Sequence, residues 1–139
     1  IRKTDSVKRI GYTVASTFLG RMCFSGDVTE LSAEQWKAIE DGMAFYKKAA
    51  PAIRDGYSYI YSHKGSSDRH LTGKHESAFV TAHIFHGEVP EKLVIDLPEG
   101  CPNTIAEVYA PTAITAKVEG RQLIITPSEE MEAISVLLK

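Results

Sequence analysis

Three adjacent residues of this sequence, Ser25, Gly26 and Asp27, combine side chains that could contact a ligand. A hydroxyl and a carboxylate offer hydrogen-bonding groups, and glycine lacks a Cβ, so a ligand or a neighbouring backbone can approach it closely. The same tripeptide also suits an ordinary turn, in which Asp27 would hold backbone N–H groups as an Asx turn. Both interpretations stay open at this point, and we do not assign Asp27 as a general acid or nucleophile.

Histidines are the next candidates, and all of them lie after Gly56. His83 and His86 are three residues apart on an expected strand, so their side chains point to opposite faces and cannot easily hold one metal ion. We expect the histidines to be exposed in loops or at strand edges, with no metal site. They are His63, His70, His75, His83 and His86.

Aromatic residues form a third group. Tyr57, Tyr59 and Tyr61 recur at steps of two and so share one face of an expected strand. Exposed tyrosines of this kind could stack on a ligand, but packing against another part of the protein is the commoner role of such a row, and we favour it. We expect Trp36 to pack in the core. The polar stretch 64–68 has no phosphate-loop pattern and is expected to form a turn.

The first 56 residues have the apolar spacing of helices. One helix is expected over residues 5–19, capped by Asp5 or Ser6 and followed by Gly20. A second begins at the capping box formed by Ser32 and Gln35 and should stop at Gly56, with a kink or break at Pro51. Its predicted apolar stripe consists of Trp36, Ile39, Met43, Tyr46, Ala50 and Ile53. Between the two helices, the short apolar run 22–24 is typical of a strand that is buried on both faces.

From Tyr57 onward the chain has the pattern of short strands separated by turns. The expected strands cover residues 57–63, 78–85, 92–97, 104–109, 114–119, a segment around Leu123 and Ile125, and 131–138. Glu119-Gly120 is a hairpin signal. Strands with no helix between them favour an antiparallel sandwich.

The two halves together suggest an incomplete domain followed by a complete one. A lone strand between two helices cannot form a sheet, because its N–H and C=O groups would be buried without partners. We therefore expect residues 1–56 to be the end of a larger α/β domain, and residues 57–139 to be an antiparallel β-sandwich appended to it. The fold class is an α+β fragment.

Composition narrows the function classes. A net charge of −2 argues against a nucleic-acid-binding protein, and no apolar run is long enough to span a bilayer. The two cysteines, Cys23 and Cys101, share no motif that would indicate a disulfide framework or a zinc site, which favours a reducing compartment. No signal peptide is visible.

The runs Leu19-Gly20-Arg21-Met22-Cys23-Phe24-Ser25-Gly26-Asp27, Leu31-Ser32-x-Glu34-Gln35-Trp36 and Phe45-Tyr46-Lys47 resemble the carboxy-terminal region of bacterial α-galactosidases of the melibiase type (glycoside hydrolase family 36-like). The resemblance covers about residues 5–56. It implies that residues 22–24 are the last strand of a (β/α)8 barrel and that residues 31 to about 50 are its last helix. Such a barrel carries its active site at the C-terminal ends of the strands, so Ser25, Gly26 and Asp27 would lie at its mouth and contact the sugar.

The resemblance also implies a retaining glycosidase that cleaves terminal α-galactosides in the bacterial cytoplasm and needs no cofactor. Association into a homo-oligomer is a further expectation. Retaining glycosidases use two carboxyl groups about 5–5.5 Å apart. Neither family motif that carries them is present in this sequence, so we assign no catalytic residue and expect this chain alone to be inactive. The open alternatives are a related α-N-acetylgalactosaminidase or galactosyltransferase, and a non-enzymatic carbohydrate-binding or interaction module.

Overall fold

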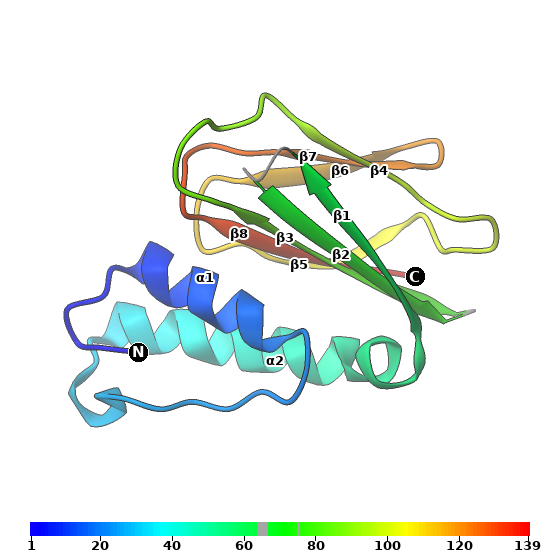
Figure 1. Cartoon of the computed structure of the whole chain (residues 1–139). Helices are drawn as coiled ribbons and strands as arrows, with labels where there is room; N and C mark the ends of the chain where they lie inside the picture. Colours follow the sequence, from blue (N-terminus) through cyan, green and yellow to red (C-terminus); the bar gives the residue numbers. More distant parts are fainter. Residues whose placement is uncertain (64–66, 75) are drawn as a thin grey trace.

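The computed structural model describes residues 1–63, 67–74 and 76–139. In this part of the chain, two α-helices are followed by antiparallel strands that form two sheets. The fold is therefore α+β, and its strands are arranged as in a sandwich (Figure 1). No helix in these ranges is both long enough and apolar enough to cross a membrane.

The helices begin where their caps predict. Helix α1 (Val7–Thr17) is capped by Ser6, whose side chain accepts a hydrogen bond from the N–H of Arg9. Helix α2 (Ala33–Asp55) starts with the complete Ser32–Gln35 capping box and ends at Gly56. It continues through Pro51 without the break that we considered, and its last turn bends away from the helix axis (Figure 1).

Sheet A has the strand order β1-β2-β3-β8-β5 and sheet B the order β4-β7-β6, with every pairing antiparallel. The bounds are β1 (Tyr57–His63), β2 (Ser67–Lys74), β3 (Ser77–Ile84), β4 (Leu93–Asp96), β5 (Ile105–Tyr109), β6 (Thr115–Glu119), β7 (Gln122–Thr126) and β8 (Ala133–Leu138). All of the expected strands after Tyr57 are confirmed. Strand β2 was not expected, because its Asp, Arg, His and Lys residues resemble a polar loop. Residues 64–66 of the expected turn lie outside the described residues.

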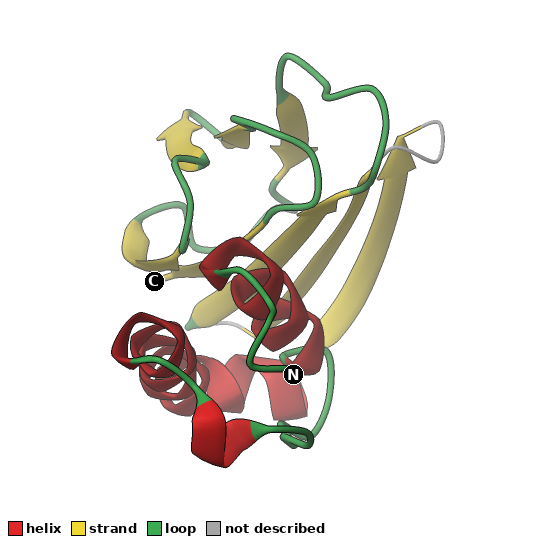
Figure 2. Ribbon diagram, turned by 90° about the vertical axis from the view of Figure 1, so that its left-hand side faces the viewer, coloured by secondary structure: helices red, strands yellow, loops and turns green. Residues whose placement is uncertain are grey.

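Strand β3 shows how the layers are stacked, because it is buried on both faces. Ala78, Val80, Ala82 and Ile84 pack into a core between the two sheets. Phe79, on the opposite face, packs into a second core against the helices. The layers therefore run from sheet B through sheet A to the helices, as the side view also shows (Figure 2).

Helix α2 has a different buried face from the one predicted. Its buried positions recur at steps of three and four, and the predicted stripe, Ile39 apart, is not buried. Trp36, expected in the core, is 37% exposed, because the capping-box turn places it beside the buried face rather than on it. The buried residues are Gln35, Ala38, Ile39, Gly42, Phe45, Ala49 and Ala52.

Candidate functional site

Ser25 ends an extended segment, residues 21–25, which runs along the helices on the side away from the sheets (Figure 1), and Gly26 and Asp27 bend the chain directly after it. All three residues are exposed. A 3-10 turn, Val28–Glu30, follows directly and leads into α2. The three predicted site residues, which are consecutive in the sequence, therefore lie on the surface.

The expected strand at residues 22–24 is not formed, which corrects the sequence prediction. The segment is extended, but within the described residues no backbone hydrogen bond involves residues 21–24. Met22 and Phe24 are half-buried against the helical core, whereas Cys23 between them is exposed, so only one face is covered. A strand needs a hydrogen-bonded neighbour, and the described part of the chain supplies none here.

One pair of hydrogen bonds at the end of this segment has the pattern of parallel strands. The backbone nitrogen of Ile1 donates to the carbonyl oxygen of Ser25 at 3.0 Å, and the N–H of Asp27 donates to the carbonyl oxygen of Ile1, also at 3.0 Å. Ile1 is thus bonded to the residues on either side of Gly26. In parallel strands, a residue makes its two backbone hydrogen bonds in this way, to the residues before and after the one that lies opposite it. Ile1 and Gly26 therefore pair in parallel, and α1 connects them.

Gly26 is required for this pairing. Its φ of +112° lies in a region that side chains rarely adopt, and a Cβ at this position would stand 1.9 Å from the carbonyl oxygen of Ile1. The sequence allowed either a ligand or a neighbouring backbone to approach Gly26 closely. In the structure, the backbone of Ile1 does so.

The Asx-turn interpretation of Asp27 does not hold. Its side chain makes no capping hydrogen bond to the turn that follows. The carboxylate is exposed and, among the described residues, has no hydrogen-bond or ion-pair partner. Ser25 is exposed beside it. This edge of the molecule therefore presents a carboxylate and a hydroxyl to solvent, and both can bind a polar ligand.

The buried side chain of Gln35 fixes the first residues against α2. Its Nε2 donates to the carbonyl oxygens of Lys3 and Asp5, at 3.0 and 2.7 Å, while its Oε1 accepts the N–H of Ser32 at 2.7 Å. The capping box predicted the bond to Ser32. The two bonds to residues 3 and 5 have no sequence signal, because they join segments about thirty residues apart.

A serine and a histidine also lie together, at the contact between α1 and sheet A. Ser16 Oγ is 3.0 Å from Nε2 of His83, and His83 is buried, contrary to our expectation of exposed histidines. Ser16 Oγ also donates to the carbonyl oxygen of Tyr12 at 2.9 Å. Because a hydroxyl has one proton, His83 is then the donor to Ser16, which leaves the serine unactivated as a nucleophile. The pair ties the helix to the sheet.

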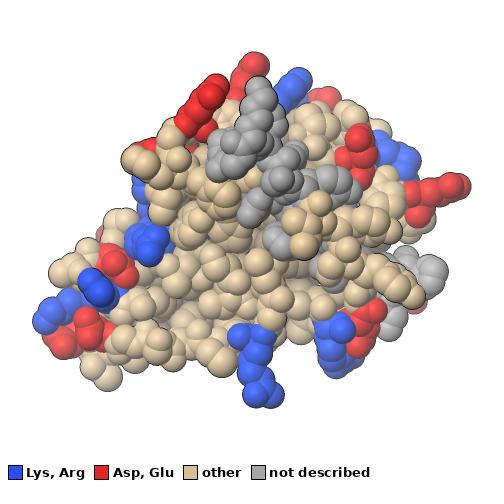
Figure 3. Space-filling model, viewed as in Figure 1, with Lys and Arg blue, Asp and Glu red and all other residues tan. Residues whose placement is uncertain are grey.

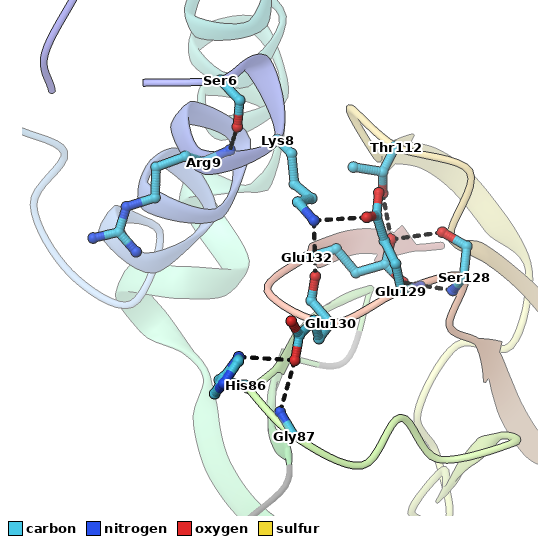
Figure 4. A network of polar contacts seen from close by, with 10 residues as sticks. All are labelled: Ser6, Lys8, Arg9, His86, Gly87, Thr112, Ser128, Glu129, Glu130 and Glu132. Carbon is cyan, nitrogen blue, oxygen red and sulfur yellow. Dashed lines mark hydrogen bonds and ion pairs between the residues drawn. The ribbon is translucent and has the colours of Figure 1, made fainter. Parts of the chain in front are cut away.

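A buried carboxylate, Glu132, organises the loop that precedes β8 (Figure 4). It accepts hydrogen bonds from the N–H and Oγ of Ser128, at 2.6 and 2.8 Å, from the N–H of Glu129 at 3.1 Å, and from Oγ1 of Thr112 at 2.7 Å. Lys8 on α1 contacts the same loop through an ion pair with Glu129 at 2.6 Å. A carboxylate with all of these donors serves the structure and is closed to a ligand.

A groove between helix and sheet has its carboxylates already paired. A shallow groove of about 250 Å³ lies between α2 and β5, where Asp41 and Glu107 contribute carboxylates. Each is paired with a lysine, Asp41 with Lys37 at 2.8 Å and Glu107 with Lys48 at 2.6 Å. Among the described residues, no three His, Cys, Asp or Glu side chains gather as they would around a metal ion. His75 lies outside these residues.

Tyr57 and Tyr59 are exposed, at 83% and 47%. The packing role that we favoured for them is not found within the described chain. Among the described residues, β1 is an edge strand of sheet A, at the opposite edge from β5. The tyrosines lie on this uncovered margin.

Comparison with known proteins gives no family assignment. No protein-family profile matches the sequence, and no curated protein matches it. Among solved structures, the crystal structure of the α-fucosidase of Thermotoga maritima is similar over 95% of this chain, with 16% identity and a TM-score of 0.32. The chain spans 34% of the length of that protein. A likeness this weak does not establish a shared fold or activity.

Proposed function

We propose that this chain is the C-terminal part of a retaining glycoside hydrolase that acts on terminal α-galactosides. In this proposal residues 1–56 are the end of a (β/α)8 barrel, and residues 57–139 are the β-sandwich that follows it. The observation that carries the proposal is the parallel pairing of Ile1 with Gly26 across α1.

That pairing fits the repeating unit of a barrel. Two parallel strands need a crossover connection, which is usually a helix, and α1 is the connection between Ile1 and the extended segment. The backbone groups of residues 21–24 form no hydrogen bond within the described chain. A parallel strand that leads into Ile1 would pair with the backbone groups on one edge of residues 21–24. Another strand would pair with the groups on their other edge.

Helix α2 supports the same arrangement. One side of it is buried against sheet A, whereas Met43, Tyr46, Ala50 and Ile53 on another side are only half-buried. Tyr46 faces the extended segment, since its hydroxyl donates to the carbonyl oxygen of Gly20 at 2.8 Å. A helix with two apolar sides is expected where it packs between two layers. The second layer would be the barrel sheet.

The position of Ser25 and Asp27 gives the proposed site. In a barrel, the residues that follow a strand lie at the mouth where substrate binds. Both side chains are exposed there, and we propose that they bind sugar hydroxyls, with the Asp27 carboxylate accepting and the Ser25 hydroxyl donating or accepting. The two reacting carboxyl groups of the retaining mechanism would come from other strands. The chemistry needs carboxylates and water and no cofactor.

The test uses the complete natural polypeptide that contains this chain, assayed with aryl α-glycosides. We expect hydrolysis of the α-galactoside with retention of configuration. Asp27→Ala should lower kcat/KM about 10- to 100-fold, because a hydrogen bond to a charged group contributes about 1.5–3 kcal/mol. Glu34→Gln, at an exposed carboxylate in the first turn of α2, is the matched control and should leave kcat/KM unchanged.

Two outcomes would contradict different parts of the proposal. A polypeptide that cleaves no α-galactoside, or prefers the α-N-acetylgalactosaminide or a transfer reaction, contradicts the assigned activity. An active enzyme in which Asp27→Ala behaves like Glu34→Gln contradicts the role of Asp27 only.

A further inference from the structure

Strand β1 is an edge strand of sheet A with a large apolar surface. It pairs with β2 on one side, and no described strand pairs with its other side. Tyr57, Tyr59 and Ile60 are 83%, 47% and 69% exposed. An unpaired apolar edge is a ready template for another strand.

The other sheet edges are protected by charges or irregularities. Strand β5, at the opposite edge of sheet A, has a register shift between Ile105 and Glu107, and Glu107 is paired with Lys48 of α2. In sheet B, β6 carries the ion pair Lys117–Glu119 at 2.7 Å, and β4 carries Asp96. Charges and bulges of this kind prevent pairing between edges.

Strand β1 has none of these features. Its sequence, Tyr-Ser-Tyr-Ile-Tyr-Ser-His, contains no Lys, Arg, Asp or Glu and no proline. Its register with β2 continues without a shift from Tyr57 to His63. On the face seen in Figure 3, the side chains coloured as Lys, Arg, Asp or Glu lie mainly around the rim. This edge is open to strand addition.

The order of residues in β1 indicates what adds to it. The sequence is symmetric about Ile60: on each side of it, the next residue is a tyrosine and the one after that is a serine. When two copies pair antiparallel about Ile60, a tyrosine therefore lies opposite a tyrosine and a serine opposite a serine, and Tyr57 lies opposite the His63 position of the other copy. Cross-strand aromatic pairs stabilise antiparallel sheets, and no like charges meet.

We propose that this protein forms a two-fold symmetric homodimer in which the β1 strands of two copies pair antiparallel, centred on Ile60, so that sheet A continues from one copy into the other. A symmetric dimer uses the same patch on both subunits, which a self-complementary strand supplies. The proposal is independent of the proposed glycosidase activity, because it involves strand β1 and neither Ser25 nor Asp27, the residues proposed to bind the sugar.

The first experiment measures the mass of the protein by light scattering during size-exclusion chromatography, over a dilution series. The unmodified protein should be a dimer. Ile60→Lys places two lysines opposite each other at the symmetry axis and should raise the dissociation constant about 100-fold or more. Val89→Lys, at a 38% exposed valine outside the strands, is the control and should remain dimeric. A monomeric unmodified protein, or a dimer that Ile60→Lys leaves intact, overturns the proposal.

The second experiment tests the register by disulfide cross-linking in a background that lacks Cys23 and Cys101. In the proposed dimer the Cα atoms of the two Ile60 residues are about 4.5–5.5 Å apart, which suits a disulfide, so Ile60→Cys should cross-link under mild oxidation. The two Tyr57 residues are six positions out of register, about 20 Å apart, so Tyr57→Cys should stay uncross-linked. Failure of Ile60→Cys to cross-link, or equal cross-linking of both variants, overturns the proposed pairing.

Discussion

Gly42 on α2 lies so close to Val14 on α1 that a Cβ on Gly42 would stand 2.3 Å from Cγ1 of Val14. The same added Cβ would lie 3.3 Å from Cζ of Tyr109, on β5. Val14 and Tyr109 belong to the core shared by the helices and sheet A. This contact therefore sets the distance between the two helices and between the helices and the sheet.

The first prediction follows from this contact. Gly42→Ala should lower the free energy of unfolding by about 1–2 kcal/mol. Overpacking a tight contact costs typically ~1–3 kcal/mol and outweighs the gain of up to about 1 kcal/mol in helix propensity. Gly20→Ala is the control, because nothing lies within 4 Å of its added Cβ. Urea unfolding of both variants measures the difference, and a Gly42→Ala protein as stable as the unmodified one would contradict the close approach.

The second prediction concerns Glu132. Glu132→Ala should destabilise the protein by about 2–4 kcal/mol, because the N–H groups of Ser128 and Glu129 lose their buried acceptor. Glu132→Gln should be milder. Its amide oxygen can still accept both N–H groups, while its NH2 can donate to the hydroxyls of Ser128 and Thr112, which rotate to accept.

Glu129→Gln is the matched control for this pair, because Glu129 is exposed and its ion pair with Lys8 is worth about 0–1 kcal/mol. Thermal unfolding ranks the three variants. Equal effects of Glu132→Ala and Glu129→Gln would show that Glu132 does not hold the loop.

The third prediction is a pH dependence. Burial, with a further contribution from the charge of Asp41, raises the pKa of Tyr109 above its usual value of about 10. Its hydroxyl donates to the carbonyl oxygen of Ala38 at 2.9 Å. Above pH 10 the unfolded chain loses this proton while the folded protein keeps it, so the contribution of Tyr109 to stability is present below pH 10 and lost above it.

The measurement compares the unmodified protein with Tyr109→Phe by denaturant unfolding between pH 8 and 11. The advantage of the unmodified protein should be constant up to about pH 9.5 and then shrink, by at most about 1.4 kcal/mol per pH unit. A difference between the two proteins that does not change with pH would mean that Tyr109 ionises equally in both states.

Local signals predicted most of the secondary structure. Ser32 and Gln35 determine the start of α2 through bonds between residues three apart, and the turn at Gly120, with φ +60°, fits the hairpin signal. Strand β2 could not be predicted in this way. Its polar sequence forms a strand because it pairs with β1 on one side and β3 on the other, and both partners are defined only in the folded chain.

The candidate site was predictable in composition but not in geometry. Ser25 and Asp27 have side chains that suit a site, whatever their surroundings. The pairing of Ile1 with Gly26 could not be predicted from the sequence, because a single residue shows no periodicity. Likewise the run 22–24 has the apolar character of a strand, but a strand exists only with a neighbour, and the described residues provide no neighbour there.

The last prediction tests the pairing of Ile1 with the extended segment. Gly26→Ala should separate the two, because its Cβ would meet the carbonyl oxygen of Ile1 at 1.9 Å and its φ is +112°. Hydrogen–deuterium exchange should then show the amide of Asp27, which Ile1 protects, exchanging at least about tenfold faster. Gly87→Ala is the control, with a similar φ of +121° and nothing within 4 Å, so it carries the backbone strain without the clash.

Amides 22–24 should exchange rapidly in every variant of this chain, since they form no hydrogen bond within its described part. They should become protected in a polypeptide that supplies the proposed neighbouring strands. Slow exchange of these amides in this chain alone would mean that the segment already has a partner, and the barrel proposal would lose its basis.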